Sequence, residues 1–297
     1  TATNHNWLLI FTKLGKCFWM RIFEVPEGSK QSKGRAIQNL ISIGLDDKVL
    51  AYIPVKDIKD PEYANANYVV LSTKLGLIKK TSLEAYSRPR TNGINAVTIR
   101  EGDELLQARL TDGDSEVIIG LKSGKAIRFN ESKTRAVGRT AMGVKGITLG
   151  SPDDEVIGMV CVNDTESSIL VVSSNGYGKR SAVDDYRITN RGGKGVKTLQ
   201  ITEKTGVLIS ILNVTNEHDL MIVNKSGITI RMAVEDLRVM GRATQGVRLI
   251  SLRGKDEIAS VCRVPKADDE EEDVEGVEAE GEQPEGEQPE GEQPEES

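Results

Sequence analysis

The chain has 297 residues and a formal net charge of −6, from 39 Lys and Arg against 45 Asp and Glu. Its three cysteines are far apart and its histidines are only His5 and His218, which argues against a disulfide framework, a metal site and Cys/His catalysis. No apolar run approaches the roughly 18 residues of a membrane-spanning helix, so we expect no membrane partner.

Five repeats follow one another along the chain, and each carries two glycine landmarks. The first landmark is a turn glycine: Gly15, Gly76, Gly124, Gly176 and Gly227. The second lies 17 to 19 residues further on: Gly34, Gly93, Gly143, Gly195 and Gly246. This register predicts repeats over residues 1–56, 66–112, 114–163, 167–215 and 218–265, which together form one domain over residues 1–265.

Short β-branched runs in the repeats predict strands. Residues 68–72, 116–120 and 220–224 are such runs, and each is followed by a glycine-containing turn typical of a hairpin. Residues 182–186 and 233–237 are expected to be single-turn connectors, and residues 57–67 a longer loop. Four short strands in a unit of about 50 residues indicate a propeller blade. We therefore predict an all-β, propeller-like fold of four-stranded blades with five visible repeats.

The C-terminal residues 266–297 differ from the rest of the chain. They hold 16 acidic residues and one basic residue, and the motif GEQPE occurs three times in succession. Such a composition predicts a disordered acidic tail. The remaining 265 residues hold 38 basic and 29 acidic residues, which is typical of a body that binds a polyanion. We expect the tail to compete with this polyanion, so that deletion of the tail tightens polyanion binding.

Cations surround the second landmark of each repeat. Because the offset is nearly fixed, we expect equivalent cations on successive blades to form a basic rim that holds a bent duplex by its phosphates. Aromatic residues are 4% of the chain, which disfavours base stacking. The candidate DNA-binding residues are Lys33, Arg35, Arg88, Arg90, Arg139, Lys145, Arg191, Lys194, Lys197, Arg238, Arg242 and Arg248.

Another basic residue follows the turn glycine by four positions in four of the five repeats, where the first repeat has Trp19 instead. Two interpretations stay open for this position: a side chain on the same rim, or one that only solvates a strand. The residues concerned are Lys80, Arg128, Arg180 and Arg231.

Two stretches resemble the C-terminal domain of the DNA gyrase A subunit. They are residues 175–180 (NGYGKR) with 194–196 (KGV), and residues 144–147 (VKGI) with Leu149 and Gly150; the similarity extends over about residues 1–264. The resemblance implies a six-bladed β-pinwheel that wraps duplex DNA and supports ATP-dependent negative supercoiling. It also implies two partners, an upstream breakage-reunion domain and an ATPase subunit, together with no cofactor in this chain and a bacterial cytoplasmic, nucleoid-associated location.

The chain departs from that family in its hallmark box, Q-[RK]-R-G-G-[RK]-G, which belongs to the first blade. We interpret the chain as a fragment that starts after this box. A box-like remnant, Arg191-Gly192-Gly193-Lys194-Gly195, lies in a later repeat, where Thr189 and Asn190 replace the first two positions.

Three other functions compete with this one. The departure from the box leaves the C-terminal domain of the topoisomerase IV A subunit open as an alternative, and a protein-binding propeller scaffold is an alternative of another class. A propeller hydrolase or lectin is disfavoured because the two histidines offer no catalytic or metal cluster. None of the tyrosines matches the context of the family's catalytic tyrosine, so we assign no catalytic residue and no enzymatic activity to this chain alone.

Overall fold

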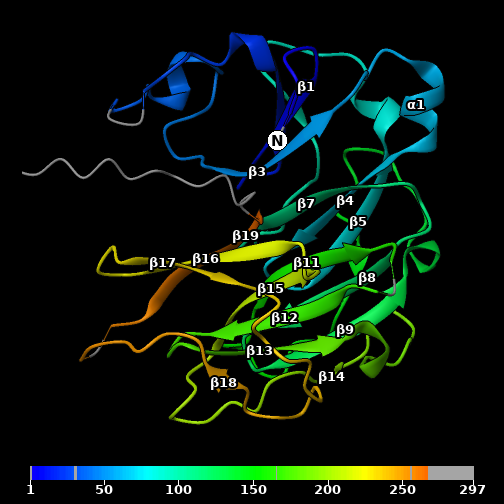
Figure 1. Cartoon of the computed structure of the whole chain (residues 1–297). Coiled ribbons are helices and arrows are strands. Elements are labelled where there is room, and N and C mark those ends of the chain that lie inside the picture. Colours follow the sequence, from blue (N-terminus) through cyan, green and yellow to red (C-terminus); the bar gives the residue numbers. More distant parts are fainter. Residues whose placement is uncertain (1, 30–31, 165, 255, 267–297) are drawn as a thin grey trace, which may run out of the picture. The chain divides into compact units, whose positions relative to one another are not determined.

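The computed structural model describes residues 2–29, 32–164, 166–254 and 256–266 (Figure 1). Residues Thr1–Lys266 form one compact unit. Apart from Lys266, the predicted acidic tail lies outside the described residues. No helix in these ranges is long and apolar enough to cross a membrane.

Each repeat opens with an antiparallel hairpin. The hairpins are β1 (Trp7–Thr12) with β2 (Lys16–Arg21), β4 (Tyr68–Thr73) with β5 (Leu77–Ser82), β8 (Glu116–Leu121) with β9 (Lys125–Asn130), β12 (Ser168–Ser173) with β13 (Tyr177–Ala182), and β16 (His218–Asn224) with β17 (Thr229–Ala233). The first-landmark glycines close the turns at φ between 78° and 90°. This backbone conformation favours glycine because it has no Cβ, so these glycines are structural.

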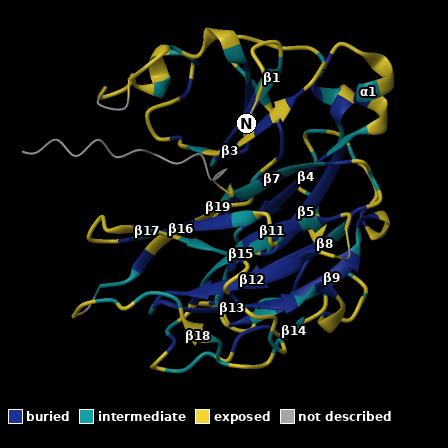
Figure 2. Cartoon of the chain, in the orientation of Figure 1, coloured by how far each residue is buried: buried dark blue, intermediate teal, exposed yellow. Residues whose placement is uncertain are grey.

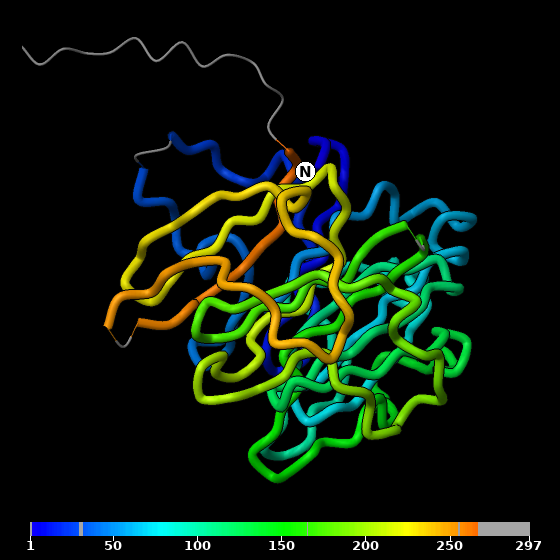
Figure 3. The backbone as a smooth tube through the Cα atoms, turned by 60° about the horizontal axis from the view of Figure 1, so that its bottom comes forward, coloured from blue at the N-terminus to red at the C-terminus, as the bar shows by residue number. Residues whose placement is uncertain are grey.

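A longer inner strand completes the central part of each sheet. These strands are β3 (Val49–Val55), β7 (Leu105–Thr111), β11 (Val156–Val162), β15 (Leu208–Val214) and β19 (Ile258–Pro265). Each pairs with the first strand of its hairpin, and neighbouring inner strands contact one another in chain order. Figure 3 shows the same succession of repeats from a second direction, from blue through green to orange. The predicted all-β, propeller-like architecture is confirmed.

The outermost strand of a sheet comes from the following repeat. The two-residue strands β6 (Ile94–Asn95), β10 (Val144–Lys145), β14 (Val196–Lys197) and β18 (Val247–Arg248) pair with β2, β5, β9 and β13. Four sheets therefore have four strands, and the fifth has three among the described residues. One sequence repeat thus does not build one blade by itself, because it gives three strands to one sheet and a fourth to the sheet before it.

This strand exchange explains the second landmark. Gly195 and Gly246 have φ of 70° and 77°. A Cβ on Gly195 would lie 2.6 Å from the carbonyl oxygen of Ala126, and one on Gly246 would lie 2.5 Å from that of Gly178. Both contacts are to the hairpin of the preceding repeat. A glycine is therefore required where an outer strand packs closely against the backbone of the preceding hairpin. This contact explains the second-landmark glycine without any need for the backbone to approach a phosphate.

Side-chain contacts to the turns fix the hairpins in their sheets. The acidic turn that precedes an inner strand holds the hairpin turn, as Asp103 accepts a hydrogen bond from the Leu75 N–H (2.9 Å) and Asp154 one from the Ser123 N–H (3.0 Å). The fourth repeat lacks this aspartate, and the Asn175 amide donates instead to the carbonyl of Glu203 (3.1 Å). A carboxylate that satisfies turn N–H groups is a structural cap.

The connections outside the hairpin turns contain little regular structure. They contain the 3-10 turns η1 (Ile22–Glu24), η2 (Ile37–Asn39), η3 (Leu83–Tyr86), η4 (Glu131–Lys133) and η5 (Val183–Asp185). The connector expected at 182–186 contains η5, whereas that at 233–237 has turns and bends without a helix. The expected loop at 57–67 contains a short α-helix, α1 (Pro61–Ala66), capped by Asp60. Figure 2 shows buried hairpin strands such as β8 and β12 and largely exposed connections.

Candidate nucleic-acid interface

Three loops carry cations at equivalent positions. We define the rim loops as residues 135–145, 187–197 and 238–248, each of which ends in an outer strand. Counted from the second-landmark glycine of each loop, a cation stands eight residues before, four residues before and two residues after. The first set is Arg135, Arg187 and Arg238; the second is Arg139, Arg191 and Arg242; the third is Lys145, Lys197 and Arg248.

The middle arginines join neighbouring loops. Arg191 is half-buried, and its guanidinium donates to the carbonyls of Lys133 (3.0 Å) and Lys145 (3.1 Å). Arg242 makes the same pair of bonds one repeat later, to Asp185 (2.9 Å) and Lys197 (2.8 Å). These arginines are structural ties that keep their positive charge at the rim.

The first tie of the series is weaker. Arg139 donates a single bond to the carbonyl of Asn95, at 3.4 Å. Asn95 occupies β6, the position that Lys145 occupies in β10. Arg139, Arg191 and Arg242 thus occupy equivalent places on successive sheets.

A second set of bonds runs along the same line. The Thr148 N–H donates to the Gly193 carbonyl (2.9 Å), and its hydroxyl donates to the Gly192 carbonyl (2.6 Å). The Thr98 hydroxyl donates to the Thr140 carbonyl (2.6 Å), and the Gln200 N–H donates to the Thr244 carbonyl (3.2 Å). The three rim loops and the ties between them form a continuous surface, which we call the belt. The box-like residues 191–195 are its middle section.

The outer two sets of cations are exposed. The side chains of Arg135, Arg187 and Arg238 and those of Lys145, Lys197 and Arg248 all reach solvent, as does Lys194. Six positive charges therefore recur at equivalent positions of successive rim loops, where they sum to a positive surface potential. The sequence prediction included Arg238 but missed Arg135 and Arg187, although the shared eight-residue offset could have found them.

Arg248 has a local partner as well. Its guanidinium donates to the Tyr177 hydroxyl (3.0 Å) and lies 5.6 Å from the centre of that ring. This bond holds the pKa of Tyr177 below its usual value. The contact orients Arg248 and leaves its charge at the end of the belt.

Four predicted cations lie elsewhere. Lys33 and Arg35 are exposed, but their stretch forms no outer strand, and a Cβ on Gly34 would meet nothing within 4 Å. Figure 1 shows the blue first repeat at the top and β14 and β18 at the bottom. Arg88 and Arg90 are exposed on a loop two residues shorter than the rim loops. Among the described residues, the repeated bonds of the belt do not include the side chains of these four.

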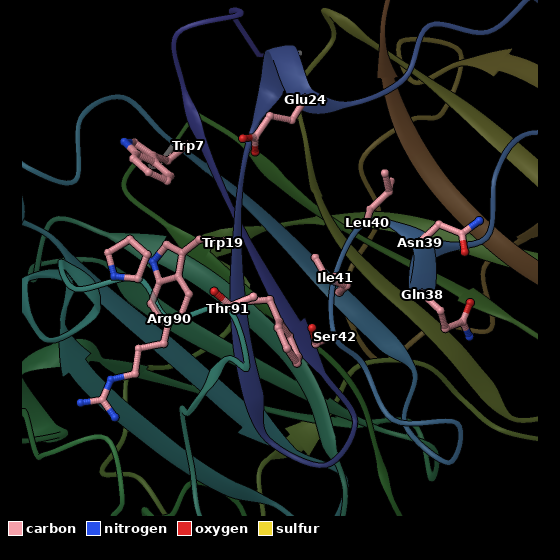
Figure 4. Close-up of a pocket in the computed structure, with 12 residues that line it drawn as sticks. Trp7, Trp19, Glu24, Gln38, Asn39, Leu40, Ile41, Ser42, Arg90 and Thr91 are labelled. Atoms are coloured by element: carbon pink, nitrogen blue, oxygen red, sulfur yellow. The ribbon is translucent and has the colours of Figure 1, made fainter.

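The shorter loop leaves a cavity. In the next repeat the Val137 N–H donates to the Lys80 carbonyl (2.9 Å), and the Thr189 N–H donates likewise to Arg128 (2.9 Å). No described residue of loop 87–92 makes the corresponding bond to Trp19. A cavity of about 400 Å³ lies there instead, lined among others by Trp7, Trp19 and residues 38–42 (Figure 4). Arg90 lines this cavity, with its guanidinium directed away from the labelled side chains of 38–42.

The basic residue four positions after the turn glycine forms a buried ion pair in two of the repeats. The Lys80 ammonium lies 2.8 Å from the Glu131 carboxylate, and the two side chains are 7% and 1% exposed. Arg128 pairs with Glu116 and donates to the Tyr186 carbonyl (3.0 Å). Neither interpretation left open by the sequence is therefore right for Lys80 and Arg128. Arg231 pairs with Asp219 (2.7 Å) on a more exposed surface.

Strand-exchanged sheets in chain order, with cations gathered beside their outer strands, define a propeller-like repeat domain with a basic rim. The chain belongs to the DNA gyrase C-terminal domain, beta-propeller, family, whose model matches residues 6–56, 67–112, 122–163, 167–215 and 218–264. Among the described residues, no three His, Cys, Asp or Glu side chains gather as a metal site would require.

Curated relatives agree with this family. The DNA gyrase A subunit of Staphylococcus aureus (strain MRSA252) is 45% identical over 275 residues, which are 92% of this chain and 30% of that protein. That of Staphylococcus epidermidis (strain ATCC 12228 / FDA PCI 1200) is 44% identical over 270 residues, or 91% and 30%. The chain thus spans 30% of the length of these relatives.

Two solved structures share the fold. The C-terminal domain of DNA topoisomerase IV matches with a TM-score of 0.78 and 24% identity, over 88% of this chain and 80% of that one. The DNA gyrase A C-terminal domain matches with a TM-score of 0.74 and 23% identity, over 88% and 83%. At these identities the likeness shows the fold alone.

Proposed function

We propose that this chain binds duplex DNA along the belt and bends it around the rim. It does so as the C-terminal part of the A subunit of a DNA gyrase, and it thereby supports ATP-dependent negative supercoiling. The observation that carries the proposal is the recurrence of cations at three equivalent positions in three successive rim loops, joined by the same arginine ties.

The energetics of DNA binding favour such an arrangement. If about nine cations contact phosphates, the logarithm of the binding constant falls with the logarithm of salt with a slope of about −8. Bending 20–30 base pairs by 40–90° costs about 1–6 kcal/mol. Contacts spread over three loops of successive repeats hold the duplex along a curved path and offset the cost of bending. Contacts on a single loop would hold the duplex at one point only and would not offset that cost.

The contacts in this proposal are to the backbone of the duplex. The belt cations suit phosphate oxygens, which position DNA without reading its sequence. Rim loops 135–145, 187–197 and 238–248 contain no Phe, Trp or Tyr, so these loops offer no stacking platform for single strands. Strand cleavage and ATP hydrolysis then fall to the upstream breakage-reunion domain and the ATPase subunit, in the bacterial cytoplasm.

The C-terminal domain of topoisomerase IV is the second candidate. The folds of both solved structures match this chain, so the fold is compatible with either candidate. The curated relatives are gyrase A subunits, which favours the first candidate. We expect the two candidates to differ in the change of linking number that the domain imposes on a circle.

The experiment is a topology assay. Nicked circular DNA is sealed by ligase with and without the purified chain, and the topoisomers are separated. A shift of the linking number that grows with protein concentration is the expected result. Binding without a shift would favour the second candidate, and no binding at low salt would overturn both. A protein partner retained after nuclease treatment would instead favour the scaffold alternative.

A further inference from the structure

Two lysines are buried at positions that other repeats fill with hydrocarbon. Lys79 on β5 is 2% exposed and Lys179 on β13 is 1% exposed. Both stand three residues after the turn glycine, where the other repeats have Phe18, Ile127 and Ile230, which pack in hydrophobic clusters. A buried ammonium is costly unless it is paired and hydrogen-bonded, so these two lysines need a reason beyond packing.

Their hydrogen-bond partners are backbone carbonyls of rim segments. The Lys79 ammonium donates to the carbonyl of Ala96 (2.5 Å), just after β6, and to the carbonyl of Arg139. The Lys179 ammonium donates to the carbonyl of Gly241 (2.5 Å), the residue before Arg242. In the described part of the chain neither ammonium has a carboxylate within ion-pair distance. Each lysine therefore binds a rim loop from its buried side. Lys79 does so at Arg139 and Lys179 at the residue before Arg242, and these two arginines donate to a neighbouring loop.

The surroundings indicate that the charge is held at a cost. Burial and, to a lesser extent, the nearby guanidinium of Arg139 lower the pKa of Lys79 to about 7. Burial lowers the pKa of Lys179, Asp185 opposes this shift and Arg242 adds to it, so that the pKa is about 8. A polar group kept at a core position against such a cost is typical of a functional site.

We propose that Lys79 and Lys179 are positioning residues for DNA binding, which fix rim loops 135–145 and 238–248 so that their exposed cations face the duplex. This inference rests on the proposed function. The middle loop, 187–197, lies over Ile127 and has no such lysine, so it provides an internal comparison.

Replacement by methionine separates this role from a merely structural one. Methionine fills a similar space with an apolar side chain, as Phe18, Ile127 and Ile230 do in the other repeats, and it removes the ammonium. We expect the double variant Lys79→Met/Lys179→Met to stay folded, with a Tm within a few degrees of the parent. We expect its affinity for a duplex of about 40 base pairs at 0.1 M salt to fall about tenfold for each loop that loses one phosphate contact. The salt slope should become shallower by about 0.9 per contact.

Three comparisons make the experiment decisive. Ile127→Met, at the same position beneath the middle loop, should leave affinity and salt slope unchanged. The double variant Lys79→Gln/Lys179→Gln keeps N–H donors and should recover part of the lost affinity. Hydrogen exchange should quicken in loops 135–145 and 238–248 of the methionine variant and not in 187–197.

Each outcome bears on the inference. A folded methionine variant with parental affinity and slope would overturn it, as would an equal loss in Ile127→Met. If the double variant does not fold, the single variants are compared, and each must affect exchange in its own loop only. If the parent chain does not bind duplex DNA, the proposed function fails, whereas the exchange result still shows whether the lysines hold the loops.

Discussion

The exposed arginines at the start of the rim loops provide the sharpest test of the belt. The variant Arg135→Gln/Arg187→Gln/Arg238→Gln removes three equivalent charges that are exposed and make no tie to a neighbouring loop. Each phosphate contact contributes about 0.9 to the slope of log K against log salt, so we expect the slope to become shallower by about 2.7. If the parent and the triple variant bind DNA equally near 1 M salt, the loss of three contacts lowers the affinity at 0.1 M salt by about 500-fold.

The assay is a duplex-binding titration by fluorescence anisotropy at several salt concentrations between about 0.05 and 0.3 M. The matched control is Lys48→Gln/Lys56→Gln/Lys59→Gln, which changes the net charge equally at exposed residues of the first repeat and the connection that follows it. It should lower affinity only modestly, because unpaired charges far from the duplex are screened over about 10 Å at 0.1 M salt. Equal slopes for the two triple variants would refute the belt and leave only a general attraction between opposite charges.

Three other changes test the architecture, each by urea unfolding monitored by circular dichroism. Arg191→Gln removes the guanidinium that binds two carbonyls and should cost about 1.5–3 kcal/mol; parental stability would mean that the ties are not energetically significant. Gly195→Ala should cost about 1–3 kcal/mol because of its positive φ and the 2.6 Å approach to a carbonyl, whereas Gly138→Ala, where a Cβ meets nothing within 4 Å, should be near neutral. Lys80→Met leaves the buried Glu131 carboxylate unpaired and should cost about 3–5 kcal/mol; adding Glu131→Gln should recover part of that loss, and no recovery would contradict the pair.

Much of the architecture could be predicted from the chain alone because it is written in repeated local signals. The glycines at the hairpin turns need a positive φ, and the flanking β-branched runs favour strands. Both signals act over a few residues, so five copies in register indicate five hairpins without reference to the rest of the molecule. The excess of positive charge in residues 1–265 likewise follows from counting.

The position of each cation could be predicted less well than its presence. Arg135 and Arg139 are only four residues apart, yet the first is exposed and the second is half-buried against another repeat. Lys80 and Lys79 are adjacent in the sequence, and both point into the interior, one to a carboxylate and the other to loop carbonyls. Composition and spacing could not separate these roles, since each depends on a partner some 17 to 60 residues away.

By itself the sequence determined the number of visible repeats, the hairpins and the all-β class, because turn chemistry and strand propensity are local. Only the tertiary structure decided that outer strands are exchanged between repeats and that the second glycine serves this contact. It also decided which cations are exposed and which tie the belt together. The physical reason is that an outer strand of two residues has little structure of its own, and it is held only where a neighbouring repeat supplies the hydrogen-bond partners.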